Sequence, residues 1–151
     1  MTAALYDRFL ANALGGLTAG ESRGIDYLSD DIRATLHTAS YVPDKATHDF
    51  VDDLTDEVSG AGYTSGGQAL TGKTLAVASS VIIADCDDVV WTNATITARR
   101  VVISDRTPAA AADQPLILYN SAASDVSSTN GTWTFQVNAN GLFRITIAAE
   151  A

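Results

Sequence analysis

The chain has 151 residues, of which 46% are hydrophobic and 18% charged, and its formal net charge is −9. This composition excludes a disordered chain, which is poor in apolar residues, and makes free nucleic acid a poor partner. The length predicts one domain with one core, and no apolar run approaches the roughly 20 residues of a membrane span.

Residues 3–14 are predicted to form a helix that ends at Gly15–Gly16, because their apolar side chains recur at helical spacing. Such a short helix is marginal alone in water, so its apolar face must dock on its own domain or on a neighbouring subunit. We therefore expect an N-terminal helical arm over residues 1–24. The tentative interface residues are Leu5, Phe9, Leu10 and Leu14. The first residues lack the basic start and long apolar run of a signal peptide, which predicts a cytoplasm-like compartment.

The next two elements have different periods. From Ile32 to Leu36 apolar and polar residues alternate, which predicts a half-buried strand with Arg33, Thr35 and His37 outward. Residues 47–57 are predicted to form a short helix with Thr47 as its N-cap, because an apolar stripe is surrounded there by carboxylates.

From Thr74 onward the pattern indicates only strands. The expected ranges are 74–79, 81–84, 89–91, 95–103, 116–120, 132–137 and 142–147. Many short strands at this spacing predict an antiparallel β-sandwich or barrel-like domain, which we place at residues 25–151. Asn140–Gly141 accepts positive φ, so the last two strands are expected to form a hairpin.

Gly67-x-x-x-x-Gly72-Lys73-Thr74 matches the phosphate-binding P-loop pattern. That loop requires a buried strand before it and a helix after it. Here a turn-rich segment precedes the match and a strand-like segment follows it. Nucleotide binding at residues 67–74 is therefore a remote alternative, and we expect no cofactor.

Two groups of carboxylates are candidate metal sites, one over residues 48–57 and one at Asp85, Asp87 and Asp88. The first lacks the twelve-residue spacing of a calcium-binding loop, and a solvated helix face accounts for it. The alternate aspartates of the second could bind calcium together with loop carbonyls, and the other interpretation is a solvated turn between two strands. With only His37, His48 and Cys86, no zinc site can be drawn without carboxylates. We expect no metal site, no catalytic residues and no enzymatic activity.

Three single residues, one cysteine and two tryptophans, are candidates for other roles. Cys86 is flanked by aspartates, which oppose thiolate formation, so we expect a structural side chain. Trp91 and Trp133 are expected to be core or interface anchors. A carbohydrate-stacking role for them would require both side chains to be exposed.

The chain resembles a family of small virion proteins of tailed bacteriophages. The resemblance rests on an Ile-Asp … Asp-x-Ile-x-Ala-x-Leu strand at 25–36, a Tyr-x-x-Asp-x-Ala-Thr-His segment at 41–48, a Gly-Tyr-Thr-x-Gly-Gly turn at 62–67 and Leu-Thr-Gly-Lys-Thr at 70–74. In proteins of this kind the Gly-Lys-Thr opens a strand and binds no nucleotide. The motifs are structural, so the resemblance implies a structural protein of the virion and no catalytic function.

Within that class we expect a capsid decoration, or cement, protein on the outer shell, assembled in the host cytoplasm. Its expected partners are the major capsid protein or neighbouring virion subunits, with further copies of itself in a homo-oligomer, and no direct nucleic acid and no membrane. An arm that buries an apolar face, repeated over a symmetric shell, gains avidity. A tail-tip, tail or head–tail connector component with receptor binding is the alternative.

Overall fold

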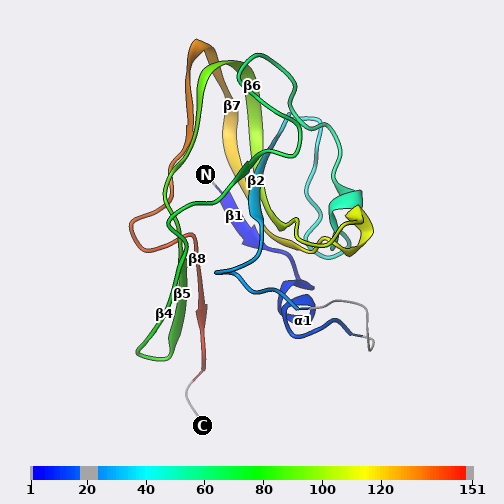
Figure 1. Cartoon of the computed structure of the whole chain (residues 1–151), viewed down its shortest axis with the longest axis vertical. Coiled ribbons are helices and arrows are strands. Elements are labelled where there is room, and N and C mark those ends of the chain that lie inside the picture. The colour runs from blue at the N-terminus through cyan, green and yellow to red at the C-terminus, as the bar shows by residue number, and fades with distance from the viewer. Residues whose placement is uncertain (1, 18–23, 149–151) are drawn as a thin grey trace.

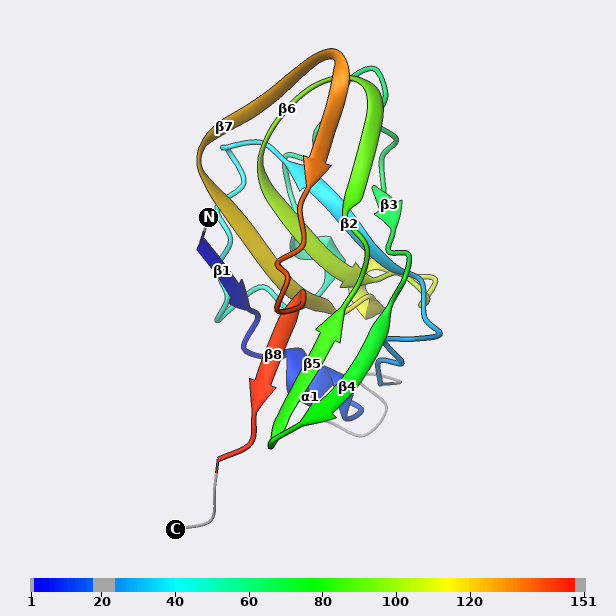
Figure 2. The ribbon, with the colours of Figure 1, turned by 90° about the vertical axis from the view of Figure 1, so that its left-hand side faces the viewer.

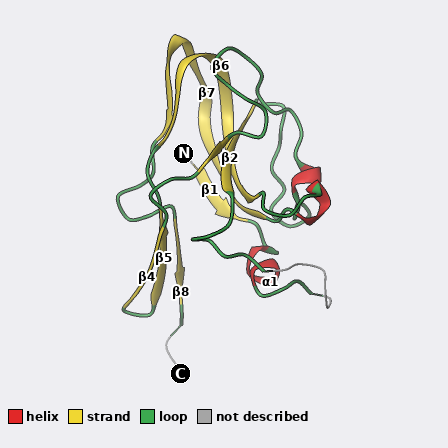
Figure 3. Cartoon of the chain, in the orientation of Figure 1, coloured by secondary structure: helices red, strands yellow, loops and turns green. Residues whose placement is uncertain are grey.

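The computed structural model describes residues 2–17 and 24–148 and is mainly β (Figure 3). One antiparallel sheet has the strand order β1-β7-β6-β2-β3, and a smaller one has the order β4-β5-β8. The strands are β1 (Thr2–Leu5), β2 (Ile32–His37), β3 (Gln68–Ala69), β4 (Thr74–Ala78), β5 (Val81–Asp85), β6 (Val89–Asp105), β7 (Leu116–Phe135) and β8 (Phe143–Thr146). The helical segments are α1 (Phe9–Ala13) and two 3₁₀ turns, η1 (Val51–Asp53) and η2 (Ala111–Asp113).

The mainly antiparallel β class predicted from the sequence is confirmed. The large sheet is built around the long β6–β7 hairpin (Figure 1). The separate strands expected at 89–91 and 95–103 are one strand, and so are those expected at 116–120 and 132–137. Their polar connecting residues resemble loops in the sequence. They continue the ladder because each strand supplies backbone partners to the other across several register shifts.

The small sheet begins with the β4–β5 hairpin, whose two turn residues, Ser79 and Ser80, both have positive φ (49° and 59°). These values are those of a type I′ turn, whose twist suits two-residue hairpins. The predicted final hairpin is wrong. Residues 133–135 of β7 pair with β6, whereas β8 pairs with β5 in the other sheet (Figure 2). The 138–141 segment is therefore a crossing between sheets.

Strand β2 is buried on both faces. The expected inward residues Ile32, Ala34 and Leu36 are fully buried, but so are Thr35 and His37 on the opposite face. A second apolar cluster covers that opposite face, contributed by Tyr6, Tyr41, Val51, Val102 and Leu116. The alternation was therefore predicted correctly, while the prediction of a solvated outer face was wrong.

The helix predicted at 47–57 is reduced to η1, and Thr47 is not its N-cap. Phe50 is at that position and forms an isolated bridge with Pro115, while Glu57 bridges to His37. These two pairings hold the segment extended on either side of one turn. A long-range backbone contact has overridden the local helical pattern.

The helix predicted at 3–14 is less than half as long as expected. Residues 2–5 form β1, which pairs with β7 along the edge of the large sheet, and only Phe9–Ala13 are helical. Tyr6 is 1% exposed and belongs to the second cluster. The described part of the expected arm at 1–24 thus contributes a strand and core side chains to the fold.

Candidate interaction surface

Helix α1 divides the four predicted interface residues into two pairs. Phe9 is 6% exposed and lies in the main core, against which Leu5 also packs. Leu10 is 48% exposed and Leu14 is 89% exposed. The core therefore uses Leu5 and Phe9, whereas Leu10 and Leu14 remain available at the surface.

An aromatic contact joins α1 to the small sheet. The ring of Phe143 on β8 packs edge-on against Phe9, with 5.3 Å between ring centroids, and against Tyr27 at 6.0 Å. The Tyr27 hydroxyl donates a hydrogen bond to the carbonyl oxygen of Asp85 at the end of β5. Edge-to-face pairs add specificity of geometry to apolar burial. The small sheet and α1 thereby form one end of the molecule, opposite the bend in the β6–β7 ribbon at the top of Figure 1.

The small sheet is only partly covered. Leu75 and Val77 lie on the same side of β4, because side chains alternate along a strand, and their partners on β5 are Ala84 and Ile82. Ala84 is fully buried, yet Leu75 is 49% exposed and Val77 is 71% exposed. On this side of the small sheet, β5 is therefore covered by the core at Ala84, whereas β4 is not covered. All of β4 is exposed.

Most of the exposed large apolar side chains of the described residues gather at this end. We call them the apolar end: Leu10, Leu14, Leu17, Leu28, Leu75, Val77 and Ile147. Except for the segment of Leu28, which lies between Asp26 and Asp30, the segments that carry them are also depleted in charge. Residues 9–17, 74–84 and 145–148 contain no ionisable side chain, in a protein of net charge −9. Core positions of protein interfaces are depleted in charged residues in the same way.

The P-loop match contains β3, ends at the first residue of β4 and does not form a phosphate cradle. Thr74 opens a strand, as the sequence indicated, so no helix N-terminus follows the glycines. Lys73 Nζ donates to the carbonyl oxygen of Asp30. Gly67 has a φ of +67°, and a Cβ there would lie 1.9 Å from the Ala34 carbonyl oxygen. A close approach to β2 requires that glycine.

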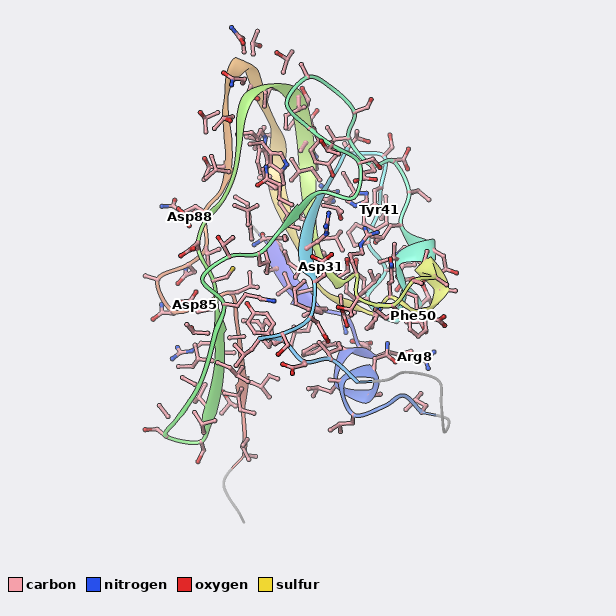
Figure 4. The ribbon with its side chains drawn as sticks, viewed as in Figure 1. Arg8, Asp31, Tyr41, Phe50, Asp85 and Asp88 are labelled. Carbon is pink, nitrogen blue, oxygen red and sulfur yellow. The ribbon has the colours of Figure 1, made fainter. Side chains whose placement is uncertain are left out.

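The carboxylates at 85–88 are loop anchors (Figure 4). Asp85 accepts a hydrogen bond from the Cys86 amide, Asp87 from the Thr71 hydroxyl, and Asp88 from the Val137 amide. Among the described residues, no three His, Cys, Asp or Glu side chains are grouped so as to hold a metal ion. This acidic cluster fastens the connections between the two sheets.

The carboxylates at 49–57 also have structural partners. Asp49 forms an ion pair with Arg8, which ties the segment before α1 to the 38–58 loop. Asp53 accepts hydrogen bonds from the amides of Asp49 and Phe50. Glu57 accepts them from Tyr63, Ser65 and Gly66. Burial acts to raise the pKa of Glu57, but these three hydrogen bonds together outweigh it and lower the pKa.

A hydrogen-bonded chain of rings lies beneath the 38–58 loop. The Tyr41 hydroxyl is 2.9 Å from that of Tyr6 and 3.0 Å from His48 Nδ1. Burial is the main reason that the pKa of Tyr41 rises to about 12 and that the pKa of Tyr6 is also raised. Both phenols therefore stay protonated near neutral pH and act as hydrogen-bond donors rather than as bases.

Cys86 and the tryptophans lie in the main core. Cys86 is 9% exposed, and burial raises the pKa of its thiol to about 11, so the thiolate is scarce at neutral pH. Trp91 and Trp133 are 1% and 4% exposed and meet edge to face at 5.5 Å. The expectation that these rings are anchors of a core is confirmed, and both are too buried to stack on a sugar.

Searches against protein-family models, curated proteins and solved structures gave no match to this chain. Within residues 2–17 and 24–148, no helix is long and apolar enough to cross a membrane. The apolar end was not predicted as a whole from the sequence. Its signal was present in the uncharged run 74–84, which predicted strands but says nothing about what covers them.

Proposed function

We propose that this protein is a non-enzymatic structural component of a tailed-bacteriophage virion, and within that class a capsid decoration protein. The single observation that supports the proposal best is the apolar end, a surface built largely from uncharged segments on an acidic domain. Exposed apolar patches on small domains mark sites of protein contact. The sequence resemblance to small virion proteins supplies the class of particle.

The distribution of charge suits a component that binds a shell by one end. An apolar end can be buried against a neighbouring subunit, while the acidic remainder keeps the outward surface soluble. Weak contacts made by one copy become effective when many copies occupy a symmetric lattice. The major capsid protein is the partner that such a lattice provides.

The test is incorporation into particles. Leu14→Lys introduces a charge into the apolar end at a side chain that is 89% exposed, and Val42→Lys makes the same kind of change at a side chain that is 71% exposed on a different segment. Both variants should melt like the wild type, because neither position is buried. We expect Leu14→Lys to reduce the copies that co-sediment with phage heads, and Val42→Lys to leave them unchanged.

Heads and tails should be separated before the copies are counted on stained gels. Hundreds of copies on heads would support decoration. Copies confined to tails would assign the protein to the tail instead, and absence from both fractions would refute a virion role.

A further inference from the structure

We propose that β4 is a self-association edge, and that two copies of this chain pair their β4 strands antiparallel to give one continuous six-stranded sheet. The inference concerns the purified protein alone and does not depend on the virion proposal. Among the described residues β4 pairs only with β5, so one side of its backbone has no ladder partner. Figure 2 shows β4 along the outer margin of the small sheet.

The hairpin geometry determines which backbone groups point outwards. Ala78 and Val81 flank a two-residue turn and form a hydrogen-bonded pair, and backbone orientation alternates from there along the strand. Thr74, Ala76 and Ala78 therefore direct their backbone groups at β5. Leu75 and Val77 direct theirs away from it, where another strand can bind them.

This edge has none of the features that normally prevent edge-to-edge pairing. Natural edges are protected by charged residues, proline, bulges or extreme shortness. Two of the other edge strands in the described sheets have such a feature, since β3 has only two residues and β8 carries Arg144. In contrast, β4 has five residues, all exposed, with the uncharged and proline-free sequence Thr-Leu-Ala-Val-Ala.

Charge and register both favour a second copy as the occupant. Two molecules of net charge −9 repel each other at most surfaces, but residues 74–84 carry no charge and can meet without that cost. A two-fold axis at Ala76 places Leu75 opposite Val77 of the second copy, twice. In this register the outward backbone groups of Leu75 and Val77 face each other, so the ladder and the apolar pairs are satisfied together.

Such an interface is small, so we expect the dimer to be weak. In sedimentation velocity, the fraction of dimer should increase with protein concentration. Val77→Lys should weaken dimerisation about tenfold or more, because the change affects both symmetric cross-strand pairs and places charge on the edge. Val126→Lys is the matched control, at a valine that is 40% exposed on β7. It should leave the dimer unchanged.

A second variant tests the register itself. Ala76 lies on the proposed two-fold axis, in a non-hydrogen-bonded position whose Cα atoms approach to about 4.5 Å, within disulfide range. In a Cys86→Ser background, Ala76→Cys should form an intermolecular disulfide under mild oxidation, and Ala123→Cys, at an exposed position on β7, should form far less. A wild type that stays monomeric at all concentrations overturns the proposal. So does a dimer that tolerates Val77→Lys or gives no disulfide through Ala76→Cys.

Discussion

His37 is a buried imidazole with a partner at each nitrogen. Nδ1 lies 2.7 Å from the Thr55 carbonyl oxygen, and Nε2 lies 3.0 Å from the Thr35 hydroxyl. The neutral ring satisfies both contacts when Nδ1–H donates to the carbonyl and the hydroxyl donates to Nε2. The sequence placed His37 on the outer side of a strand, and only the covering loop makes its protonation costly.

That environment predicts a pH dependence of stability. Burial is the largest influence and lowers the pKa of His37, helped by Arg106 and opposed by Thr55, Glu57 and Asp56. Just below the ordinary value of about 6.5, the unfolded chain therefore binds more protons than the folded one. We expect the free energy of unfolding to decrease as the pH falls from about 6.5 to 5.

An NMR titration of the ring together with urea unfolding at several pH values measures this. His37→Gln should flatten the dependence in the same window, even if it lowers stability at neutral pH. A ring that titrates above the ordinary value would contradict the prediction.

Gly141 was correctly predicted to have a positive φ, but the strands on either side of it do not pair with each other. Its φ is +103°, as a turn glycine requires, but a Cβ there would lie 2.8 Å from the Ala84 carbonyl oxygen and 2.9 Å from Ile83 Cγ2. We expect Gly141→Ala to cost at least about 1–3 kcal/mol, from backbone strain and from the displaced β5. Thermal and urea unfolding measure the loss.

The control for this substitution is Gly131→Ala on β7. Gly131 has no positive φ, and the nearest atom to its Cβ position would be 3.6 Å away. If the two substitutions lowered the free energy of unfolding equally, the segment that crosses between the sheets would not be tightly packed.

At the scale of elements, α1 has a buried side and an exposed side within a few residues. Phe9 is in the core, so we expect Phe9→Ala to cost about 3–5 kcal/mol. Leu14→Ala should change stability by no more than about 0.5 kcal/mol, since this side chain is largely in water. Urea unfolding of both variants checks the assignment.

Residues 2–6 at the N-terminus supply an edge strand and a core side chain. If residues 1–16 were a detachable arm, the domain would survive their removal. Because β1 pairs with β7 and Tyr6 fills the second cluster, we expect the truncated chain to lose its cooperative melt. A cooperative melt at the wild-type temperature would instead support the interpretation of residues 1–16 as a detachable arm.

At the scale of the whole molecule, the two sheets share one core. The main cluster includes Ala84 from the small sheet and Trp91 and Trp133 from the large one. We therefore expect a single unfolding transition in which tryptophan fluorescence and far-UV circular dichroism coincide.

Phe143 tests this coupling, because it belongs to the small sheet and packs against Phe9 and Tyr27. Phe143→Ala should lower the melting temperature reported by the tryptophans of the other sheet, and Arg144→Ala, at the exposed neighbouring position, should have little effect. Two separate transitions in the variant would show that the sheets unfold independently.

The sequence by itself determined the class of the fold, several strands near their observed bounds, and the strand-like flank that disqualifies the P-loop match. These properties depend on side-chain periodicity and on turn residues, which are local in the chain. The pairing of strands, in contrast, depends on residues that are far apart in the chain. Only the tertiary structure decided that β8 joins β5, that β1 edges the large sheet, and that the 47–57 segment is extended around one turn, because backbone groups from distant residues compete for the same partners. The apolar end was decided in the same way. Whether Leu75 or Leu14 is a core or a surface residue depends on what else the fold places over it, and no periodicity records that.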